Sequence, residues 1–181
     1  MEEIMRTRGL VIVNTGNGKG KTTAALGLAL RAWGQQMRIL IIQFIKGNSQ
    51  YGELEALRAL PGDRIKIVQM GEGFTQKNTG VSKEEHIKAA QTALHKAIEA
   101  EKDDLWDMLI LDEINYAVKF GLLTEEEVLS LLDNKPDMLH LVLTGREATT
   151  AVLAKADLVT EMKEIKHPYK AGIKAQKGIE F

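Results

Sequence analysis

A stretch that alternates glycine with polar and cationic residues lies near the start of the chain, at residues 14–23 (NTGNGKGKTT). A short apolar run precedes it at residues 10–13, and a helix-forming run follows at residues 24–33. A strand, a glycine-rich loop and a helix opening near Gly-Lys-Thr form the usual context of a phosphate-binding loop. The glycines let backbone N–H groups turn inward around phosphate oxygens, and the helix N-terminus adds positive potential.

Individual residues of this loop have different predicted roles. Lys21 is expected to place its ammonium on the phosphates, and the Thr22 hydroxyl is expected to bind magnesium. The strict pattern G-x-x-x-x-G-K-[ST] requires glycine at position 15, where this chain has Thr15, and Lys19 adds a cation to the loop. The alternative interpretation is a glycine-rich turn in a sheet protein that binds no ligand. The nucleotide-contacting residues that we predict here are Gly16, Asn17, Gly18, Lys19, Gly20, Lys21, Thr22 and Thr23.

Two adjacent carboxylates follow a second apolar run. Residues 108–111 read as a buried strand, and Asp112 and Glu113 come directly after it. Beside a phosphate-binding loop, an acid at a strand end reaches magnesium directly or through water. We therefore predict a magnesium site formed by Thr22, Asp112 and Glu113. The alternative is that Glu113 only caps the segment that follows.

Other charged residues have less specific patterns. Arg146 follows Thr144-Gly145 at another predicted strand end, where a guanidinium can reach phosphate oxygens, and we include it among the nucleotide-binding residues. An ordinary surface arginine is the alternative, and Lys46 is equally ambiguous. The histidines show no metal-ligand spacing. They are His86, His95, His140 and His167.

Composition limits the class of protein. The chain has 181 residues, 44% of them hydrophobic, a net charge of -1 and no cysteine. These values predict a single domain over residues 1–181, with a short N-terminal arm (1–8) and a polar C-terminal tail (166–181). They exclude disulfides and thiolate chemistry, and they give no reason to expect nucleic acid as a partner. No run approaches membrane-spanning length and the start lacks a secretory signal, so we expect no membrane partner and a cytoplasmic protein.

Strand-like and helix-like segments alternate along the chain. Two helices carry capping boxes at their starts, Ser82 with Glu85 and Thr124 with Glu127. The pattern predicts an α/β protein with a three-layer, P-loop NTPase-like (RecA-like) fold, in which about six mostly parallel strands have helices on both faces. Ligands of such sheets collect beyond the carboxyl ends of the strands. The further predicted strands are 38–44, 65–70, 138–144 and 158–162, and the further helices are 53–60, 82–101, 124–134 and 148–156.

Several short stretches match one known family together. They include the unusual loop at residues 15–25, the segment 43–47 (QFIKG), the segment 73–75 (GFT) and much of the tail at 166–181. On these stretches the chain resembles the P-loop ATP:corrinoid adenosyltransferases, which act on cob(I)alamin and cob(I)yrinic acid a,c-diamide. Thr15 and Lys19 belong to that family pattern. The remaining matching stretches are 8–10, 52–53, 111–113 and 144–146.

The resemblance implies a displacement at carbon. In this family the Co(I) of the corrinoid attacks the ribose C5′ of ATP, a Co–C bond forms, and tripolyphosphate leaves. ATP and the corrinoid are then the substrates, and Mg²⁺ or Mn²⁺ is the cofactor. Fixed donors must meet the growing charge of the leaving triphosphate, which makes Lys21 a catalytic residue.

The resemblance also implies a catalytic aromatic residue and protein partners. In the family, a Gly-Phe-Thr-Trp loop crowds the lower face of the corrin and displaces its axial ligand. Here Phe74 matches, whereas Gln76 stands where the tryptophan usually is. A flavoprotein-type reductase and a homodimer are the expected partners. The competing functions are a P-loop kinase or ATPase that transfers the γ-phosphoryl group, and a non-catalytic module that binds nucleotide or corrinoid.

Overall fold

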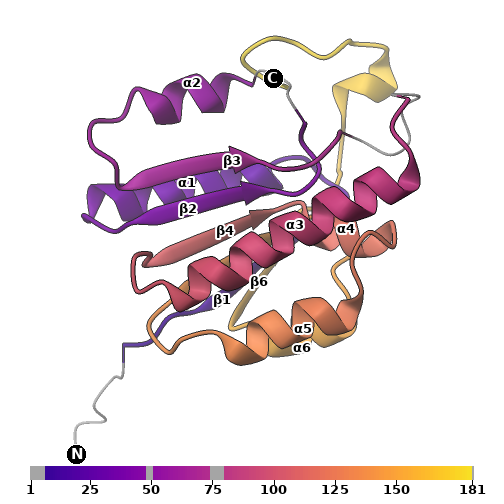
Figure 1. Ribbon diagram of the computed structural model, residues 1–181. Helices are drawn as coiled ribbons and strands as arrows, with labels where there is room; N and C mark the ends of the chain where they lie inside the picture. The colour runs from indigo at the N-terminus through magenta and orange to yellow at the C-terminus, as the bar shows by residue number, and fades with distance from the viewer. Residues whose placement is uncertain (1–6, 48–50, 74–79, 181) are drawn as a thin grey trace, which may run out of the picture.

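The computed structural model describes residues 7–47, 51–73 and 80–180, which form a six-stranded sheet with helices on both sides (Figure 1). The strand order is β3-β2-β4-β5-β1-β6, and all five pairings are parallel. The predicted α/β architecture with six parallel strands is thus confirmed. The strands are β1 (Val11–Thr15), β2 (Ile39–Gln43), β3 (Ile65–Gln69), β4 (Met108–Asp112), β5 (His140–Thr144) and β6 (Leu158–Glu161).

The helices follow the predicted alternation with three differences. The first helix begins at Lys21, three residues before the predicted run 24–33, so Gly-Lys-Thr lies at its start. A six-residue helix directly after Glu113 and a 3₁₀ turn in the C-terminal tail were not predicted. The elements are α1 (Lys21–Gly34), α2 (Gly52–Arg58), α3 (Lys83–Lys102), α4 (Ile114–Lys119), α5 (Glu125–Asn134), α6 (Thr150–Lys155) and η1 (Pro168–Ala171).

Alternate residues of the central strands face two separate cores. In β4, Leu109 and Leu111 pack in the core that includes α3 and α5, whereas Met108 and Ile110 pack in the core that includes α1. Side chains of a strand point to opposite faces in turn, so a strand that is apolar throughout must be covered on both faces. This is the reason that β2 and β4 read as continuous apolar runs in the sequence.

Both predicted capping boxes are present. Ser82 Oγ accepts a hydrogen bond from Glu85 N at 3.2 Å, and Ser82 N donates to Glu85 Oε2 at 2.7 Å. Thr124 and Glu127 make the same reciprocal pair at the start of α5. Each pair satisfies two backbone donors that the first helical turn leaves free.

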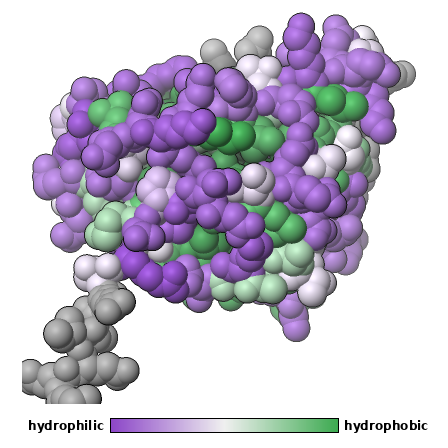
Figure 2. All heavy atoms as spheres, turned by 60° about the horizontal axis from the view of Figure 1, so that its bottom comes forward, coloured by the Kyte–Doolittle hydropathy of each residue, from purple (hydrophilic) through white to green (hydrophobic). Residues whose placement is uncertain are grey.

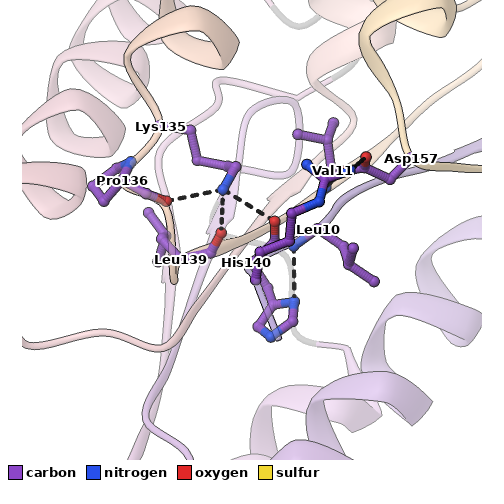
Figure 3. A network of polar contacts seen from close by, with 9 residues as sticks. Leu10, Val11, Lys135, Pro136, Leu139, His140 and Asp157 are labelled. Carbon is purple, nitrogen blue, oxygen red and sulfur yellow. Dashed lines mark hydrogen bonds and ion pairs between the residues drawn. The ribbon is translucent and has the colours of Figure 1, made fainter. Parts of the chain in front are cut away.

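A polar network fixes the amino end of β1 (Figure 3). The Lys135 ammonium, just after α5, donates to the backbone carbonyls of Gly9, Pro136 and Leu139 at 3.2, 2.9 and 3.0 Å. Leu10 N donates to His140 Nδ1 at 3.1 Å, which gives this strand histidine a structural role. The register of β1 is therefore set at the end of the sheet opposite the glycine-rich loop.

Hydrophilic residues dominate the surface around α5 and α6, with separate hydrophobic patches between them (Figure 2). β6 is exposed along its whole length, in contrast to the buried β1 beside it. In the part of the chain that the structure describes, no helix has the length and apolar character needed to cross a membrane.

The buried Glu101 side chain should make the stability of the folded protein depend on pH. This side chain is buried in the last turn of α3, and burial raises its pKa to about 7 against the opposing effect of Lys135 and Lys102. In the unfolded chain this carboxyl has its ordinary pKa of 4.5, so the folded state loses stability as pH rises from there to about 7. Glu101→Gln should raise the free energy of unfolding by about 2 kcal/mol at pH 8 and change it little at pH 4.5.

Urea unfolding at both pH values measures this difference. Glu99→Gln is the matched control, because Glu99 is exposed on the same helix. An equal effect of Glu101→Gln at the two pH values would contradict the assignment.

Candidate nucleotide site

The carboxyl ends of β1, β2 and β4 open into one pocket of about 670 Å³. Its wall includes the glycine-rich loop, the segment after β2, the segment after β4 and part of the C-terminal tail. In Figure 1 the yellow tail lies on the side of the sheet where the strand arrows end. Among the predicted site residues, the pocket is lined by Asn17, Gly18, Lys19, Gly20, Lys21, Thr22, Thr23, Glu113 and Arg146.

The glycine loop packs tightly against the chain that leaves β6. Gly18 N donates to Met162 O at 2.6 Å, and a Cβ atom at Gly18 would lie 2.7 Å from the same carbonyl. At Gly16 a Cβ would lie 2.5 Å from Met162 O, and its φ of +94° is in the left-handed region. Glycine is therefore required at both positions by a backbone neighbour, and at Gly16 also by its left-handed backbone conformation.

Thr15 has a contact of its own where the strict motif has glycine. Its hydroxyl accepts a hydrogen bond from Ala148 N at 3.2 Å. Thr15 thus connects the end of β1 to the segment that leads into α6. This contact accounts for the departure from the strict pattern, and it was not predictable from the loop itself.

Lys21 lies inside the loop. Its ammonium donates to Gly16 O at 2.8 Å and to Gly18 O at 2.7 Å, and the residue is 7% exposed. Burial lowers the pKa of Lys21, Glu113 raises it and Arg146 lowers it, and the net direction is down. A cation enclosed by the loop, next to the first amides of α1, gives this end of the pocket a positive character.

Asp112 connects four segments of the site. Its Oδ1 accepts from the Thr22 hydroxyl at 2.7 Å and from the Thr144 hydroxyl at 2.8 Å. Its Oδ2 accepts from Gln43 Nε2 at 3.0 Å and lies 3.7 Å from the Lys46 ammonium. Asp112 is 1% exposed, and these partners compensate the cost of burying its charge. The structure therefore brings Thr22 and Asp112 together, as predicted.

Lys46, whose role the sequence left open, lines the pocket. Its ammonium donates to Glu53 Oε1 at 2.8 Å and lies 4.5 Å from the centre of the Tyr51 ring. Burial alone lowers the pKa of Lys46, but Asp112 and Glu53 outweigh this effect and the net direction is up. Lys46 thus remains a cation at the edge of the pocket. Its position at the end of an apolar strand was the available signal in the sequence.

Glu113 differs from its neighbour Asp112. It directly precedes α4 with a φ of 65°, and its backbone N–H donates to the Thr144 hydroxyl at 2.9 Å. Its Oε2 atom is buried and has no hydrogen-bond partner among the residues that the structure describes. Burial and the nearby Asp112 raise its pKa to about 7, against Lys21, Lys46 and Arg146. Glu113 therefore brings to the pocket a buried carboxylate oxygen that has no partner in the described part of the chain.

The side chain of Lys19 turns to the C-terminal tail, where it donates to Ile179 O at 2.7 Å. Phe74, the predicted catalytic aromatic residue, and Gln76 lie outside the described residues. Tail residues His167, Gly178, Ile179 and Glu180 line the pocket, and only the overall resemblance of the tail pointed to them in the sequence.

Residues 7–181 match the family model described as ATP:corrinoid adenosyltransferase BtuR/CobO/CobP. The chain belongs to this family. A corrinoid adenosyltransferase of Sinorhizobium sp is 43% identical over 99% of this chain and 86% of its own length. A corrinoid adenosyltransferase of Pseudomonas aeruginosa is 41% identical over 96% of this chain and 84% of its own length. One of Salmonella typhimurium is 38% identical over 96% of this chain and 86% of its own length.

A solved structure of a KaiC-like protein from Pyrococcus horikoshii is 18% identical, with a TM-score of 0.46, and covers 88% of this chain and 75% of its own. Family membership confirms the resemblance to the adenosyltransferases that the loop and the shorter stretches indicated. It covers almost the whole chain, including the C-terminal tail.

Thr144 offers a test of the polar network. Thr144→Val keeps the shape of the side chain but removes the donor to Asp112 and the acceptor for Glu113 N–H. Because both partners remain buried, we expect a loss of about 1–3 kcal/mol in the free energy of unfolding. We also expect weaker binding of Mg-ATP, since Asp112 loses one of the contacts that orient it.

Urea unfolding and equilibrium dialysis with Mg-ATP measure the two effects. Thr160→Val, at an exposed position of β6, is the matched control and should change neither quantity. Unchanged stability of the Thr144→Val variant would refute the role of this hydroxyl.

Proposed function

We propose that this protein transfers the 5′-deoxyadenosyl group of ATP to the Co(I) centre of a reduced corrinoid and releases tripolyphosphate. Family membership over residues 7–181 is the observation that carries the proposal. The pocket supports it, because a glycine loop, a helix N-terminus and several cations surround the space beyond the strand ends. ATP as donor and tripolyphosphate as product are parts of the proposal.

The role of the pocket is to stabilise a departing anion. In the proposed step, the electron pair of Co(I) forms a bond to C5′, and the C5′–O5′ bond breaks with its electrons on the triphosphate. Loop amides and Lys21 would meet the charge that develops on the leaving group. Arg146, exposed at the pocket wall, would bind phosphate oxygens as a fork of N–H donors. The step transfers no proton, so it needs no general base.

The residues also suit a magnesium ion. Thr22 directs its hydroxyl proton to Asp112 and keeps lone pairs for a cation, and Glu113 has a buried oxygen without a partner in the described part of the chain. Within that part, no cluster of three or more histidine or acidic side chains forms a metal site. This suits Mg²⁺, which commonly takes few protein ligands together with water and phosphate oxygens. When bound, the ion would neutralise charge on the triphosphate, with Mn²⁺ as a substitute.

Asp112 would act on this ion through Thr22. Both Asp112 oxygens already accept hydrogen bonds, so its proposed role is to orient the Thr22 hydroxyl. Glu113 is the better candidate for direct or water-mediated contact. The role of Phe74 at the corrin, a homodimer and an electron-donating flavoprotein remain predictions. The same holds for the boundaries of one domain over residues 1–181.

An anaerobic assay tests the reaction. The protein is incubated with ATP, Mg²⁺ and chemically reduced cobalamin, and the products are followed by absorbance and by phosphate chromatography. We expect a light-sensitive alkylcobalt product and one tripolyphosphate for each adenosyl group transferred. ADP and phosphate without alkylcobalt would instead establish a kinase or ATPase, and tight corrinoid binding without turnover would establish a carrier. A parallel assay with the a,c-diamide precursor compares the two corrinoid classes.

Lys21 provides a quantitative prediction. Lys21→Met keeps the length of the side chain but removes the charge next to the leaving group, so kcat/KM for ATP should fall by about 100-fold or more. Lys88→Met, at an exposed position of α3, is the control and should retain activity. Thermal unfolding of both variants separates a catalytic loss from a loss of the loop conformation. A Lys21→Met enzyme that is folded and fully active would remove Lys21 from the mechanism.

A further inference from the structure

Lys19 makes two contacts with the C-terminal tail, although it lies in the middle of the glycine loop. Its ammonium donates to Ile179 O at 2.7 Å and lies 2.5 Å from Glu180 Oε2. The two partners are about 160 residues away along the chain. One cation thus connects the first strand-to-helix loop to the far end of the sequence.

The two lysine side chains of the loop point in different directions. Lys21 turns inward and donates to loop carbonyls, whereas Lys19 turns outward to the tail. The ammonium of Lys19 has three N–H donors, and the tail carbonyl and carboxylate provide two acceptors for them. With these two contacts made, Lys19 is oriented toward the tail.

The tail has little packing of its own to hold it in place. Tyr169 is 79% exposed and Ile179 is 67% exposed, so the apolar side chains of this segment bury little surface. Its internal structure consists of two short turns. In η1, His167 Nδ1 accepts from Tyr169 N at 3.2 Å, and near the end of the tail Gln176 O accepts from Ile179 N at 3.1 Å and from Glu180 N at 2.8 Å. A segment with so few buried contacts has low local stability, and individual polar contacts then decide its position.

The same tail residues form part of the pocket wall. Gly178, Ile179 and Glu180 line the pocket together with Lys21 and Thr22. The contacts of Lys19 therefore hold in place the part of the pocket wall that the tail forms. If they were lost, the pocket would open toward solvent on that side.

From these contacts we propose that Lys19 is a positioning residue that binds the C-terminal tail through Ile179 O and Glu180 and so closes the nucleotide pocket, and that it does not act as a phosphate ligand. The idea rests on the proposed function insofar as the nucleotide is ATP. It replaces the direct role in ATP binding that the sequence predicted for Lys19. The closed tail limits solvent access and keeps bound ATP in the pocket.

The test compares Lys19→Met, Glu180→Gln and the double variant. If Lys19 acts through Glu180, each single change should raise the Kd for Mg-ATP by about three- to tenfold, because each weakens the same contact. The double variant should then lose little more than either single variant, since the two changes are coupled. The KM for ATP should rise with the Kd, whereas kcat with reduced corrinoid should change by less than about threefold.

Two controls accompany these variants. Lys19→Arg retains a cation and should retain most of the affinity for Mg-ATP. Lys177→Met changes an exposed tail lysine that lies outside the pocket wall and should match the unchanged protein. Weaker Mg-ATP binding in Lys19→Met, but unchanged or tighter binding in Glu180→Gln, would overturn the proposal and make Lys19 a phosphate ligand. Additive losses in the double variant would also overturn it.

A second measurement does not depend on nucleotide or activity. Limited trypsin digestion of the nucleotide-free protein reports cleavage after the exposed Lys174, which mass spectrometry detects. We expect faster cleavage in Lys19→Met and Glu180→Gln than in the unchanged protein and in the Lys177→Met control. Equal rates would refute the contact between loop and tail, even if the protein makes adenosylcorrinoid. If the two variants are cleaved faster but the unchanged protein fails the adenosylation assay, the contact between loop and tail stands and the proposed function is overturned.

Discussion

Asp112 is a carboxylate that is only 1% exposed, and its need for partners ties the site to the fold. A buried charge is tolerated when hydrogen bonds and an opposite charge surround it. The partners of Asp112 come from α1, β2, β5 and the segment after β2. These elements must therefore pack together before the Asp112 carboxylate has its hydrogen-bond partners. One of these partners, Thr22, is also a proposed magnesium ligand.

The parallel sheet makes this arrangement possible. All six strands run in one direction, so the residues that follow them gather at one edge. At the opposite edge, Lys135 and His140 fix the start of β1 through backbone contacts. The strand between these two ends is five residues long and fully buried. A fixed start and a rigid strand thus determine where the glycine loop lies.

The lysines that line this pocket differ in role. Lys21 is enclosed by the loop, Lys46 is paired with Glu53 near Asp112, and Lys19 contacts the tail. Only the first has the position expected of a phosphate-binding lysine. The other two organise the groups around the pocket. Charge alone is therefore a poor guide to which residue contacts a ligand, because the partner of each ammonium decides what it can still bind.

The sequence by itself determined the sheet elements, the two capping boxes and the family. These features depend on local periodicity, on residues three positions apart and on a contiguous loop, all of which are visible along the chain. It did not predict the six-residue helix α4, which follows a left-handed Glu113 whose backbone N–H donates to Thr144 of another strand.

The tertiary structure alone decided three features of the site. They are the contacts of Lys19 with the C-terminal tail, the packing of Gly16 and Gly18 against Met162, and the position of Lys46 beside Asp112. The physical reason is that each of these contacts joins residues far apart in sequence. Their energies depend on the distance and burial that the folded sheet creates, and neither quantity exists before the chain has folded.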